Sequence, residues 1–384
     1  MKKIGILTLY HKNYNFGGLL QAYALPAALN KYFNLNAEQI DYQYLEQQSI
    51  SPSTHIDFKS LIYNTGIRFF TLLTKSGISK RKKAMNRFMN DIPHSSQTYF
   101  HQSISDCINQ YDIYICGSDQ IWNDDCQSLN GKENIQIFTL QFVPQSKKKL
   151  SYAASMAVLD TSAIFRQLFK TGLLSLDYIS VREKQSIPIL QQFTDQSISL
   201  VVDPVLLLDK NDWEKISRPA KHPQKYILCY LLGDNVSQRK EVSRISKELK
   251  LPVVTFSHIF CNVVRKCDLF FGDIHDYTSG PREFIDLIKN ADLIITDSFH
   301  ACVFSMIFER PFWVFERHKS GQAGNMNSRI YNFLEEYRLE QQLLSEEDVK
   351  KVNRIPSIDF SYAQSHLQKR RQESLDYLKK ALEI

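Results

Sequence analysis

The sequence predicts an α/β protein with two domains, and three observations support that prediction. Apolar runs of strand length alternate with helical patterns through most of the 384 residues, which is typical of parallel β–α units. The length exceeds what one ordinary hydrophobic core supports. Prolines and charges gather between Asp203 and Pro223, and the alternation restarts at Tyr226. We therefore expect a domain boundary close to residue 204.

The first half contains six apolar runs that we expect to be strands: Ile4–Leu9, Ala37–Asp41, Asp112–Cys116, Lys149–Ala153, Tyr178–Val181 and Ser197–Val202. The helices expected between them are Gly18–Phe33, Ser162–Leu174 and Glu183–Phe193. Pro26 lies inside the first helix and is expected to kink or divide it. Residues 46–102 break the alternation, and we expect a helical insertion there, with helices at Lys59–Thr74 and Ser79–Asn90.

The second half repeats the alternation with a new set of elements. The expected strands are Tyr226–Leu232, Pro252–Phe256, Leu293–Thr296 and Phe312–Phe315, and the expected helices are Ser237–Leu249, Pro281–Asn290, His300–Phe308, Arg329–Tyr337 and Ser361–Leu382. Two Rossmann-like domains that face a cleft are the simplest architecture for this order. We expect them at 1–204 and 205–345, with a helical segment at 346–384 that packs back on the first domain.

Composition excludes several classes of protein. No run of about 18 uncharged apolar residues occurs, so no transmembrane helix is expected. The N-terminus lacks the features of a signal peptide and reads as a first strand, which favours a cytoplasmic location. The seven cysteines are scattered without CxxC spacing, and no HExxH motif occurs, so no disulfide framework or metal site is expected. The formal charge of +6 is modest and dispersed. Nucleic-acid binding is therefore not indicated, whereas anionic small substrates or a membrane surface carrying lipid-linked ones are compatible.

The most informative segment is 290–315, in which a buried strand runs into a polar turn and then an apolar helix. Thr296, Asp297 and Ser298 form the turn, and His300 opens the helix. In open α/β sheets, ligands bind at the carboxyl ends of strands. Free N–H groups at a helix start favour an anion. This segment therefore predicts an anion site with a proton carrier beside it, although a lone histidine is more often structural.

Two other strand ends carry candidate binding groups. The first expected strand leads to Asn15, Gly17 and Gly18, which suit close approach of a ligand to the backbone, or simply open a helix. The motif is neither GxGxxG nor a Walker loop. After Asp112–Cys116, Asp119, Trp122 and Asn123 suit a hydroxyl-rich ligand, with Asp119 accepting from sugar hydroxyls and Trp122 stacking on a ring. The alternative is an Asx-type turn with Trp122 in the core.

Further charged and imidazole groups lie at other strand ends and loops. Arg182 follows the strand Tyr178–Val181, where an arginine can hold phosphate or carboxylate in a bidentate contact, or form an ordinary ion pair. The histidines that compete with His300 for a catalytic role are His11, His258, His275 and His318.

Six blocks together resemble the polysaccharide pyruvyl transferase family over most of the chain. They are 15–25 (Asn-Phe-Gly-Gly-Leu-Leu-Gln-Ala-Tyr-Ala-Leu), 117–123 (Gly-Ser-Asp-Gln-Ile-Trp-Asn), 180–183 (Ser-Val-Arg-Glu), 202–204 (Val-Asp-Pro), 280–284 (Gly-Pro-Arg-Glu-Phe) and 296–300 (Thr-Asp-Ser-Phe-His). The resemblance implies a fold similar to GT-B glycosyltransferases. It implies transfer of a pyruvyl group from phosphoenolpyruvate, as co-substrate, to two hydroxyls of one sugar, which gives a cyclic ketal without a further cofactor. By this resemblance, His300 is the catalytic histidine and Arg182 a donor-anion ligand.

One position departs from the pattern of some family members, which have an arginine two residues before the histidine where this chain has Ser298. Ser298 and neighbouring N–H groups can suffice, another cation among Arg282, Arg317 and Arg329 can substitute, or the donor can differ.

The leading hypothesis is a cytoplasmic enzyme that pyruvylates a sugar on a nucleotide- or lipid-linked precursor of a surface polysaccharide, compatible with peripheral association with membrane-bound glycan assembly. The expected donor-binding residues are Arg182, Thr296, Asp297, Ser298 and Arg329, with His300 catalytic. The expected acceptor-binding residues are Asn15, Gly17, Gly18, Asp119, Trp122 and Asn123. The alternatives are a GT-B glycosyltransferase that uses a nucleotide sugar and a non-catalytic glycan- or anion-binding protein.

Overall fold

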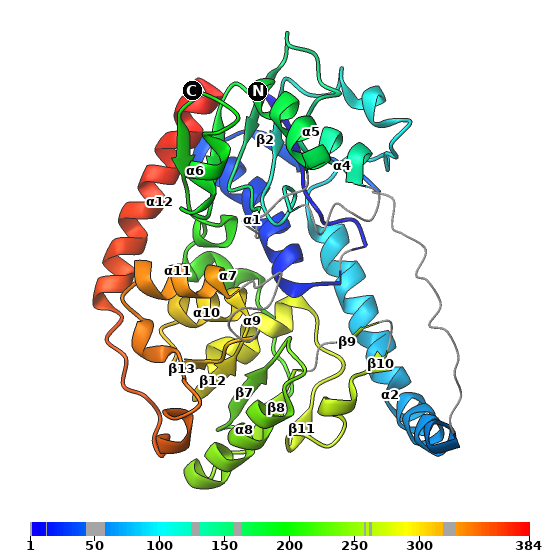
Figure 1. Ribbon diagram of the computed structural model, residues 1–384, viewed down its shortest axis with the longest axis vertical. Helices are drawn as coiled ribbons and strands as arrows, with labels where there is room; N and C mark the ends of the chain where they lie inside the picture. The colour runs from blue at the N-terminus through cyan, green and yellow to red at the C-terminus, as the bar shows by residue number, and fades with distance from the viewer. Residues whose placement is uncertain are drawn as a thin grey trace. The chain divides into compact units, whose positions relative to one another are not determined.

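The computed structural model describes residues 2–12, 14–43, 58–123, 131–156, 163–256, 259–260, 263–317 and 327–384. The chain forms two compact units (Figure 1). Unit 1 consists of Met1–Gln47, Arg87–Asp209 and Ser365–Ile384, and unit 2 of Gln48–Asn86 and Lys210–Gln364. The sequence placed the insertion 46–102 in the first domain, whereas residues 48–86 belong to unit 2. The predicted segment 346–384 is likewise divided, and only 365–384 belong to unit 1.

Unit 1 contains a four-stranded parallel sheet in the order β2-β1-β3-β4. The strands are β1 (Lys3–Leu7), β2 (Asn36–Gln39), β3 (Ile113–Cys116) and β4 (Lys148–Ser151). Two further parallel strands, β5 (Ile179–Val181) and β6 (Ile198–Leu200), continue from β4 through the bridges Leu150↔Tyr178 and Ala154↔Val181. Because β1 pairs with β2 on one side and β3 on the other, the strand order reverses between β1 and β3. Such a reversal is where open α/β sheets bind ligands.

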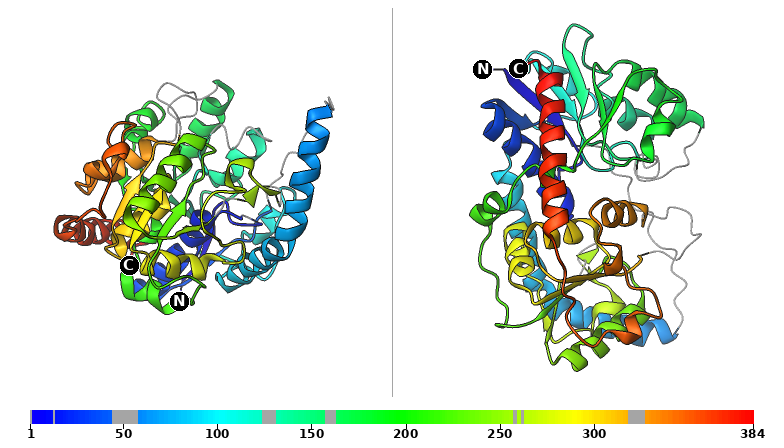
Figure 2. Two further views of the ribbon diagram at one scale, coloured as in Figure 1. Left: turned by 90° about the horizontal axis from the view of Figure 1, so that it is seen from below. Right: turned by 90° about the vertical axis from the view of Figure 1, so that its left-hand side faces the viewer.

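The helices of unit 1 follow its strands. They are α1 (Phe16–Phe33), α4 (Gly131–Phe138), α5 (Ala163–Leu174), α6 (Ser186–Leu190) and most of α12 (Ser361–Leu382), with 3-10 turns η1 (Ile104–Cys107) and η2 (Pro204–Leu206). The two chain ends lie side by side, and Lys2 Nζ donates to the carbonyl of Leu382 at 2.9 Å (Figure 2). The α6 helix is shorter than the predicted Glu183–Phe193.

Pro26 was expected to kink or divide the first helix, and it does not divide it, because α1 continues through it. A proline has no N–H to donate to the carbonyl four residues earlier, which here belongs to Ala22. The buried side chain of Gln39, at the end of β2, donates its Nε2 to that carbonyl at 2.8 Å. A neighbouring strand therefore supplies the hydrogen bond that the proline removes.

Unit 2 contains a five-stranded parallel sheet in the order β11-β8-β7-β12-β13. The strands are β7 (Ile227–Tyr230), β8 (Val253–Thr255), β11 (Ile274–His275), β12 (Leu293–Thr296) and β13 (Phe312–Val314), and a small antiparallel pair is formed by β9 (Ile259–Phe260) and β10 (Val263–Val264). The helices are α7 (Lys210–Ile216), α8 (Val236–Leu249), α9 (Pro281–Asn290), α10 (Phe299–Ile307) and α11 (Ser328–Glu336), with 3-10 turns η3 (Lys266–Asp268), η4 (Glu340–Gln342) and η5 (Val349–Lys351). Here the order reverses between β7 and β12.

The insertion forms one helix, α2 (Phe58–Asp91), so the prediction of two helices is wrong. Gly77 lies between the two predicted helices, and it serves a packing contact. A Cβ added at Gly77 would lie 2.9 Å from Cβ of Tyr277, closer than real Cβ atoms approach. Arg81, one turn further along, is buried over the ring of Phe256 at 4.4 Å and donates to the carbonyl of Asp276. The glycine therefore lets α2 dock closely within unit 2.

Each unit has its own apolar core. In unit 1, Trp122, Phe138 and Phe169 are among the fully buried members, and in unit 2 Ile227 and Ile295 come from adjacent central strands. Among the described helices, none is long and apolar enough to cross a bilayer. The described residues also hold no group of three or more His, Cys, Asp or Glu side chains arranged to bind a metal ion.

Candidate functional site

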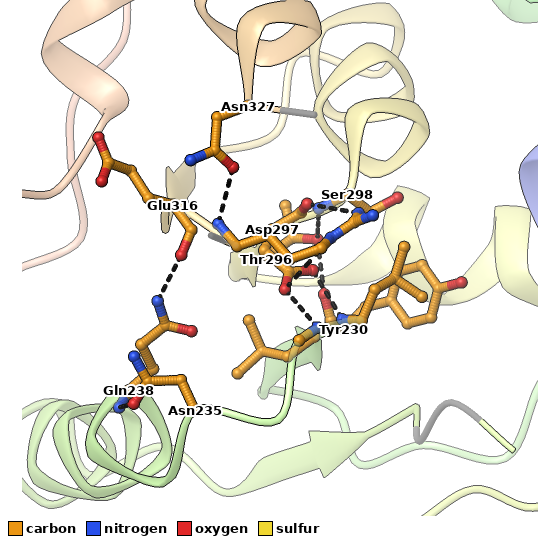
Figure 3. Close-up of polar contacts among 12 residues, drawn as sticks. Tyr230, Asn235, Gln238, Thr296, Asp297, Ser298, Glu316 and Asn327 are labelled. Atoms are coloured by element: carbon orange, nitrogen blue, oxygen red, sulfur yellow. Dashed lines mark hydrogen bonds and ion pairs between the residues drawn. The ribbon is translucent and has the colours of Figure 1, made fainter. Parts of the chain in front are cut away.

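The carboxyl ends of β7 and β12 lie side by side at the reversal of strand order in unit 2 (Figure 3). Tyr230 pairs with Thr296 at the end of the two strands. The chain then leaves β7 towards α8 and leaves β12 towards α10, which begins at Phe299. A crevice between such diverging connections is the usual ligand site of an open parallel sheet. The structure therefore places the turn that the sequence singled out at this position.

Inside this turn, Asp297 is a structural group. Its carboxylate is fully buried and accepts the backbone N–H groups of Leu232 at 2.6 Å and Gly233 at 2.7 Å. The Thr296 hydroxyl donates to the Tyr230 carbonyl at 2.6 Å and accepts the N–H of Ser298 at 3.0 Å. These bonds tie the two strand ends together. The expectation that Thr296 and Asp297 bind the donor is not supported, because their polar atoms are engaged and a carboxylate repels an anion.

Ser298 and His300 occupy the start of α10. Ser298 is the N-cap residue, and its side chain makes no capping hydrogen bond. His300 is the second residue of the helix and is partly exposed, with its ring edge-on to Phe299 at 5.1 Å. The first N–H groups of a helix have no acceptor within the helix and carry the positive end of its dipole. The imidazole of His300 therefore lies at the N-terminus of α10, a position that favours a bound anion.

Arg317 is the cation that the structure brings to this turn. Its Nη2 donates to the Asp297 carbonyl at 2.9 Å, and its Nε lies 3.7 Å from Asp297 Oδ2. The backbone N–H of Arg317 is fixed by Asn327 Oδ1 at 3.1 Å. The same loop is tied to α8, because Gln238 Nε2 donates to the Glu316 carbonyl at 2.7 Å (Figure 3). Arg317 therefore stands where a guanidinium can supplement Ser298.

The other two cations differ in placement. Arg282 donates from Nη1 to the carbonyl of Ile216, so it joins α9 to the end of α7. Arg329 is the second residue of α11 and is partly buried. Phe333, one turn further on the same helix face, packs edge-on against Phe299 at 5.9 Å. This contact packs α11 against the beginning of α10 through the helix face that also carries Arg329.

At the first strand end of unit 1, the expected acceptor ligands mainly build the start of α1. Asn15 is the N-cap, and its Oδ1 accepts the N–H of Gly18 at 3.2 Å. Gly17 and Gly18 lie buried in the first turn. The alternative of two glycines that open a helix is therefore what the structure shows. Asn13, which belongs to the same loop between the first strand and α1, lies outside the described residues.

The second strand end corrects the assignment of Trp122. Its indole is fully buried, packs edge-on against Phe169 at 5.1 Å, and donates Nε1–H to the Phe138 carbonyl at 3.1 Å. Trp122 is thus a core residue, and its expected stacking on a sugar ring is not supported. Asn123 is buried and donates Nδ2 to Gln120 Oε1 at 2.8 Å.

Arg182 is enclosed by carboxylates within unit 1. Its guanidinium lies 2.5 Å from Asp203, 3.0 Å from Glu183 and 3.6 Å from Asp119, and its side chain is 3% exposed. Burial alone would lower the pKa of Arg182, but the three carboxylates outweigh burial and raise it. A cation neutralised by three acids attracts no further anion. The expectation that Arg182 binds the donor is therefore not supported, and its role is to hold Asp119, whose side chain is 17% exposed.

The competing histidines fall into three groups. His258 and His318 lie outside the described residues. His275 stacks on Tyr277 with ring centroids 5.7 Å apart and has Nδ1 3.1 Å from Thr255 Oγ1, and burial lowers its pKa. His11 pairs with Asp41 in unit 1. Sequence reasoning did not single out Asp41, although His11 follows the first predicted strand and Asp41 ends the second, which was the available signal.

Solved structures of known proteins resemble the fold of this chain. The UDP-GlcNAc 2-epimerase of Methanocaldococcus jannaschii matches with a TM-score of 0.52 and 12% identity, over 97% of this chain and 99% of that one. The S. aureus MnaA–UDP structure matches with a TM-score of 0.51 and 14% identity, over 100% and 97%. At these identities the likeness concerns the fold alone, which is α/β and GT-B-like, so the predicted fold class is confirmed. That the two domains face a cleft stays a prediction.

The sequence itself gives the family. A family model described as polysaccharide pyruvyl transferase matches residues 15–319, and the chain belongs to that family. The resemblance inferred from the six sequence blocks is thereby confirmed. No curated protein matches the chain in sequence.

Proposed function

We propose that this protein transfers a pyruvyl group from phosphoenolpyruvate to two hydroxyls of one sugar in a polysaccharide precursor. Family membership supports the reaction class. The observation that carries the proposal is the coincidence of His300, the start of α10 and Arg317 at one turn. Phosphoenolpyruvate presents a phosphate, a carboxylate and a methylene carbon that must be protonated. The turn offers groups for each of these needs.

The proposed reaction balances without a cofactor beyond the co-substrate. A proton adds to the methylene carbon, which becomes a methyl group, and one sugar oxygen bonds to the adjacent carbon. The second sugar oxygen bonds to that carbon as the bond to phosphate breaks. Of the two hydroxyl protons released, one is balanced by the new C–H bond and the other leaves with phosphate. His300 is assigned the proton transfer to carbon, a general acid–base role that contributes typically ~10²–10⁴-fold.

The donor's negative charges are assigned to the remaining groups at the turn. The N-terminus of α10 and the hydroxyl of Ser298 hold phosphate oxygens, while Arg317 and Arg329 supply charge-assisted hydrogen bonds. Asp119 is assigned to the acceptor sugar, because a carboxylate accepts from hydroxyls. The acceptor is proposed to be nucleotide- or lipid-linked and the location cytoplasmic, at the membrane periphery for a lipid-linked acceptor.

The test is to incubate the protein with phosphoenolpyruvate and a panel of sugar acceptors and to follow phosphate release. We expect acceptor-dependent release that falls at least ~10²-fold in His300→Ala. His94→Ala is the matched control, because the ring of His94 bonds a local carbonyl, that of Ile92. Release at wild-type rate in His300→Ala, or no release with any nucleotide- or lipid-linked acceptor, would contradict the proposal.

A GT-B glycosyltransferase that uses a nucleotide sugar is the second candidate, favoured by the GT-B-like fold. The two candidates differ in the ligand that should stabilise the protein. A ligand that binds only the folded state raises the melting temperature. Stabilisation by phosphoenolpyruvate and not by UDP supports the pyruvyl transferase, and the reverse pattern supports the glycosyltransferase.

A further inference from the structure

In unit 1, the side chains of His11 and Asp41 form a hydrogen-bonded pair at the edge of the sheet where the parallel strands have their carboxyl ends. His11 Nδ1 lies 2.6 Å from Asp41 Oδ1. His11 follows β1 and Asp41 follows β2, and these strands are parallel neighbours with Ile6 opposite Gln39. Their carboxyl ends are therefore adjacent, beside the reversal of strand order between β1 and β3. The counterpart of the His300 turn, which follows β12, is the loop after β3 that carries Asp119, and the His11–Asp41 pair lies next to that loop at the ends of β1 and β2.

The surroundings of Asp41 keep its carboxylate ionised. Thr98 Oγ1 donates to Oδ2 at 2.5 Å, and Tyr10 Oη donates to Oδ1 at 3.1 Å. Burial alone would raise the pKa of Asp41, but the hydrogen bonds from His11 and Thr98 outweigh burial and lower it. An ionised carboxylate can only accept a hydrogen bond. The proton between the two side chains therefore belongs to Nδ1 of His11.

The other ring nitrogen of His11 is left as the reactive atom. With Nδ1 protonated, the neutral ring carries a lone pair on Nε2. Nε2 is buried and has no hydrogen-bond partner in the part of the chain that the structure describes. The side chain as a whole keeps 14% exposure, so the ring lies directly beneath the surface. A buried polar atom without a partner requires an explanation, and a carboxylate that orients an imidazole is the arrangement of a general base.

A second carboxylate lies at the same edge. Asp119 follows β3, the other neighbour of β1, and is held by Arg182. The hydroxyl of Thr8 donates to the Ser118 carbonyl at 2.9 Å, which joins the loop after β1 to the loop after β3. Two carboxylates and an imidazole lone pair suit a ligand that donates hydrogen bonds. A polyhydroxylated sugar ring has this chemistry, whereas phosphoenolpyruvate does not.

We infer that His11 Nε2 is the base that takes the proton of an acceptor-sugar hydroxyl, with Asp41 as its positioning residue. This inference rests on the proposed pyruvyl transfer, in which two hydroxyl protons must be removed. The new bond forms between the sugar oxygen and the pyruvyl carbon as the O–H bond breaks, and the proton passes to Nε2. His300 and His11 then have separate tasks, protonation of carbon and deprotonation of oxygen.

The first experiment measures phosphate release from phosphoenolpyruvate with methyl glycosides of glucose, galactose and mannose and with UDP-linked sugars as acceptors. In His11→Ala we expect kcat to fall about 10²–10⁴-fold, with the melting-temperature shift caused by phosphoenolpyruvate unchanged. Added imidazole should restore part of the lost rate. Asp41→Asn should lower kcat without imidazole rescue, because the ring is still present. His94→Ala should retain the wild-type rate.

A His11→Ala variant with more than half of the wild-type kcat would overturn the inference while leaving the proposed function intact. A loss of rate that imidazole does not restore, accompanied by loss of the phosphoenolpyruvate-induced shift, would show a structural role and overturn it too. If the wild type releases no phosphate with any acceptor, the proposed function fails first.

The dyad is then tested without turnover, by long-range ¹H–¹⁵N spectra of histidine-labelled protein. We expect a protonated Nδ1, an unprotonated Nε2, and a change in the Nε2 resonance of His11 on addition of at least one methyl glycoside. The opposite tautomer, or a resonance that no glycoside perturbs, would overturn the inference.

Discussion

Gly233 donates its backbone N–H to the carboxylate of Asp297 at 2.7 Å, and a Cβ added at Gly233 would lie 3.0 Å from the same oxygen. The loop after β7 thus approaches the turn after β12 as closely as a glycine allows. The same added Cβ would lie 3.2 Å from Cγ of Arg317. Gly233, Asp297 and Arg317 are therefore packed tightly against one another beside the proposed donor site.

Replacement of Asp297 by alanine should destabilise unit 2. The variant loses two hydrogen bonds to a buried carboxylate and leaves Arg317 without its carboxylate partner. Removal of one member of such a buried network costs about 3–5 kcal/mol. Urea denaturation should show a lower midpoint, whereas the exposed Glu346→Gln should leave it unchanged. A midpoint equal to the wild type would refute the structural role.

Replacement of Arg317 by lysine should weaken binding of phosphoenolpyruvate. Lysine keeps the positive charge but loses the planar fork that can hold a phosphate or carboxylate with two parallel hydrogen bonds. We expect KM for phosphoenolpyruvate to rise about 10-fold, which corresponds to roughly 1.4 kcal/mol. Arg282→Lys is the matched control, since Arg282 bonds a carbonyl of the α7 end. Equal KM values in both variants would exclude Arg317 as a donor ligand.

Replacement of Arg182 by methionine separates a structural role from donor binding. The substitution leaves Asp203, Glu183 and Asp119 without their shared cation. We expect the free energy of unfolding to fall by about 3–5 kcal/mol. Any folded fraction should bind phosphoenolpyruvate with unchanged affinity, measured by calorimetry at low temperature. A stable variant with selectively weakened donor binding would restore the assignment made from the sequence.

Replacement of Trp122 by alanine should lower stability and leave acceptor affinity unchanged. The indole is fully buried and its Nε1–H is bonded to the Phe138 carbonyl. Truncation of a buried tryptophan costs about 3–5 kcal/mol. Thermal unfolding gives the stability, and KM for the acceptor gives the affinity. A large rise in KM with unchanged stability would instead show that Trp122 contacts the sugar.

Stability should decline at high pH because several buried tyrosines hold their protons more tightly in the folded state. Burial is the main cause that raises the pKa of Tyr277 and of Tyr331 to about 12. Unfolded tyrosine ionises near pH ~10. A folded pKa above the unfolded one gives stability that is complete below pH ~10 and is lost as pH rises towards 12. Urea midpoints measured between pH 8 and 12 should fall in this window, and less steeply in Tyr331→Phe.

The sequence was a reliable guide wherever one residue pattern decides the local structure. The strand Leu293–Thr296 appears at its predicted position, and the following helix begins at Phe299, one residue before the predicted start at His300. The predictions fail where a residue distant in the sequence determines the local structure. Pro26 stays in a continuous helix because Gln39 compensates for it, and Gly77 lies inside a helix because Tyr277 packs against it. Neither partner is adjacent in sequence, so local pattern could not show its effect.

The candidate site shows the same limit. Position at a strand end was predictable for Asp297, Arg182 and Trp122, but the partners of their polar atoms were not. Each of these side chains is engaged within its own unit, and only the folded structure shows this. His300 kept its predicted position at the start of a helix, while Asp41 gained a candidate role only through its 2.6 Å contact with His11.

The C-terminal helix has a consequence for the order in which the chain folds during synthesis. Residues 365–384 belong to unit 1, where Ser374 bonds the N–H of Val202 and Tyr377 bonds the carbonyl of Ser151. The Ser151 carbonyl also accepts Ser180 Oγ at 2.8 Å, but the hydroxyl of Ser374 can reach the N–H of Val202 only after residue 374 has been synthesised. Unit 2, by contrast, ends at residue 364. We therefore expect unit 1 to complete its packing only after the whole of residues 210–364 has been synthesised.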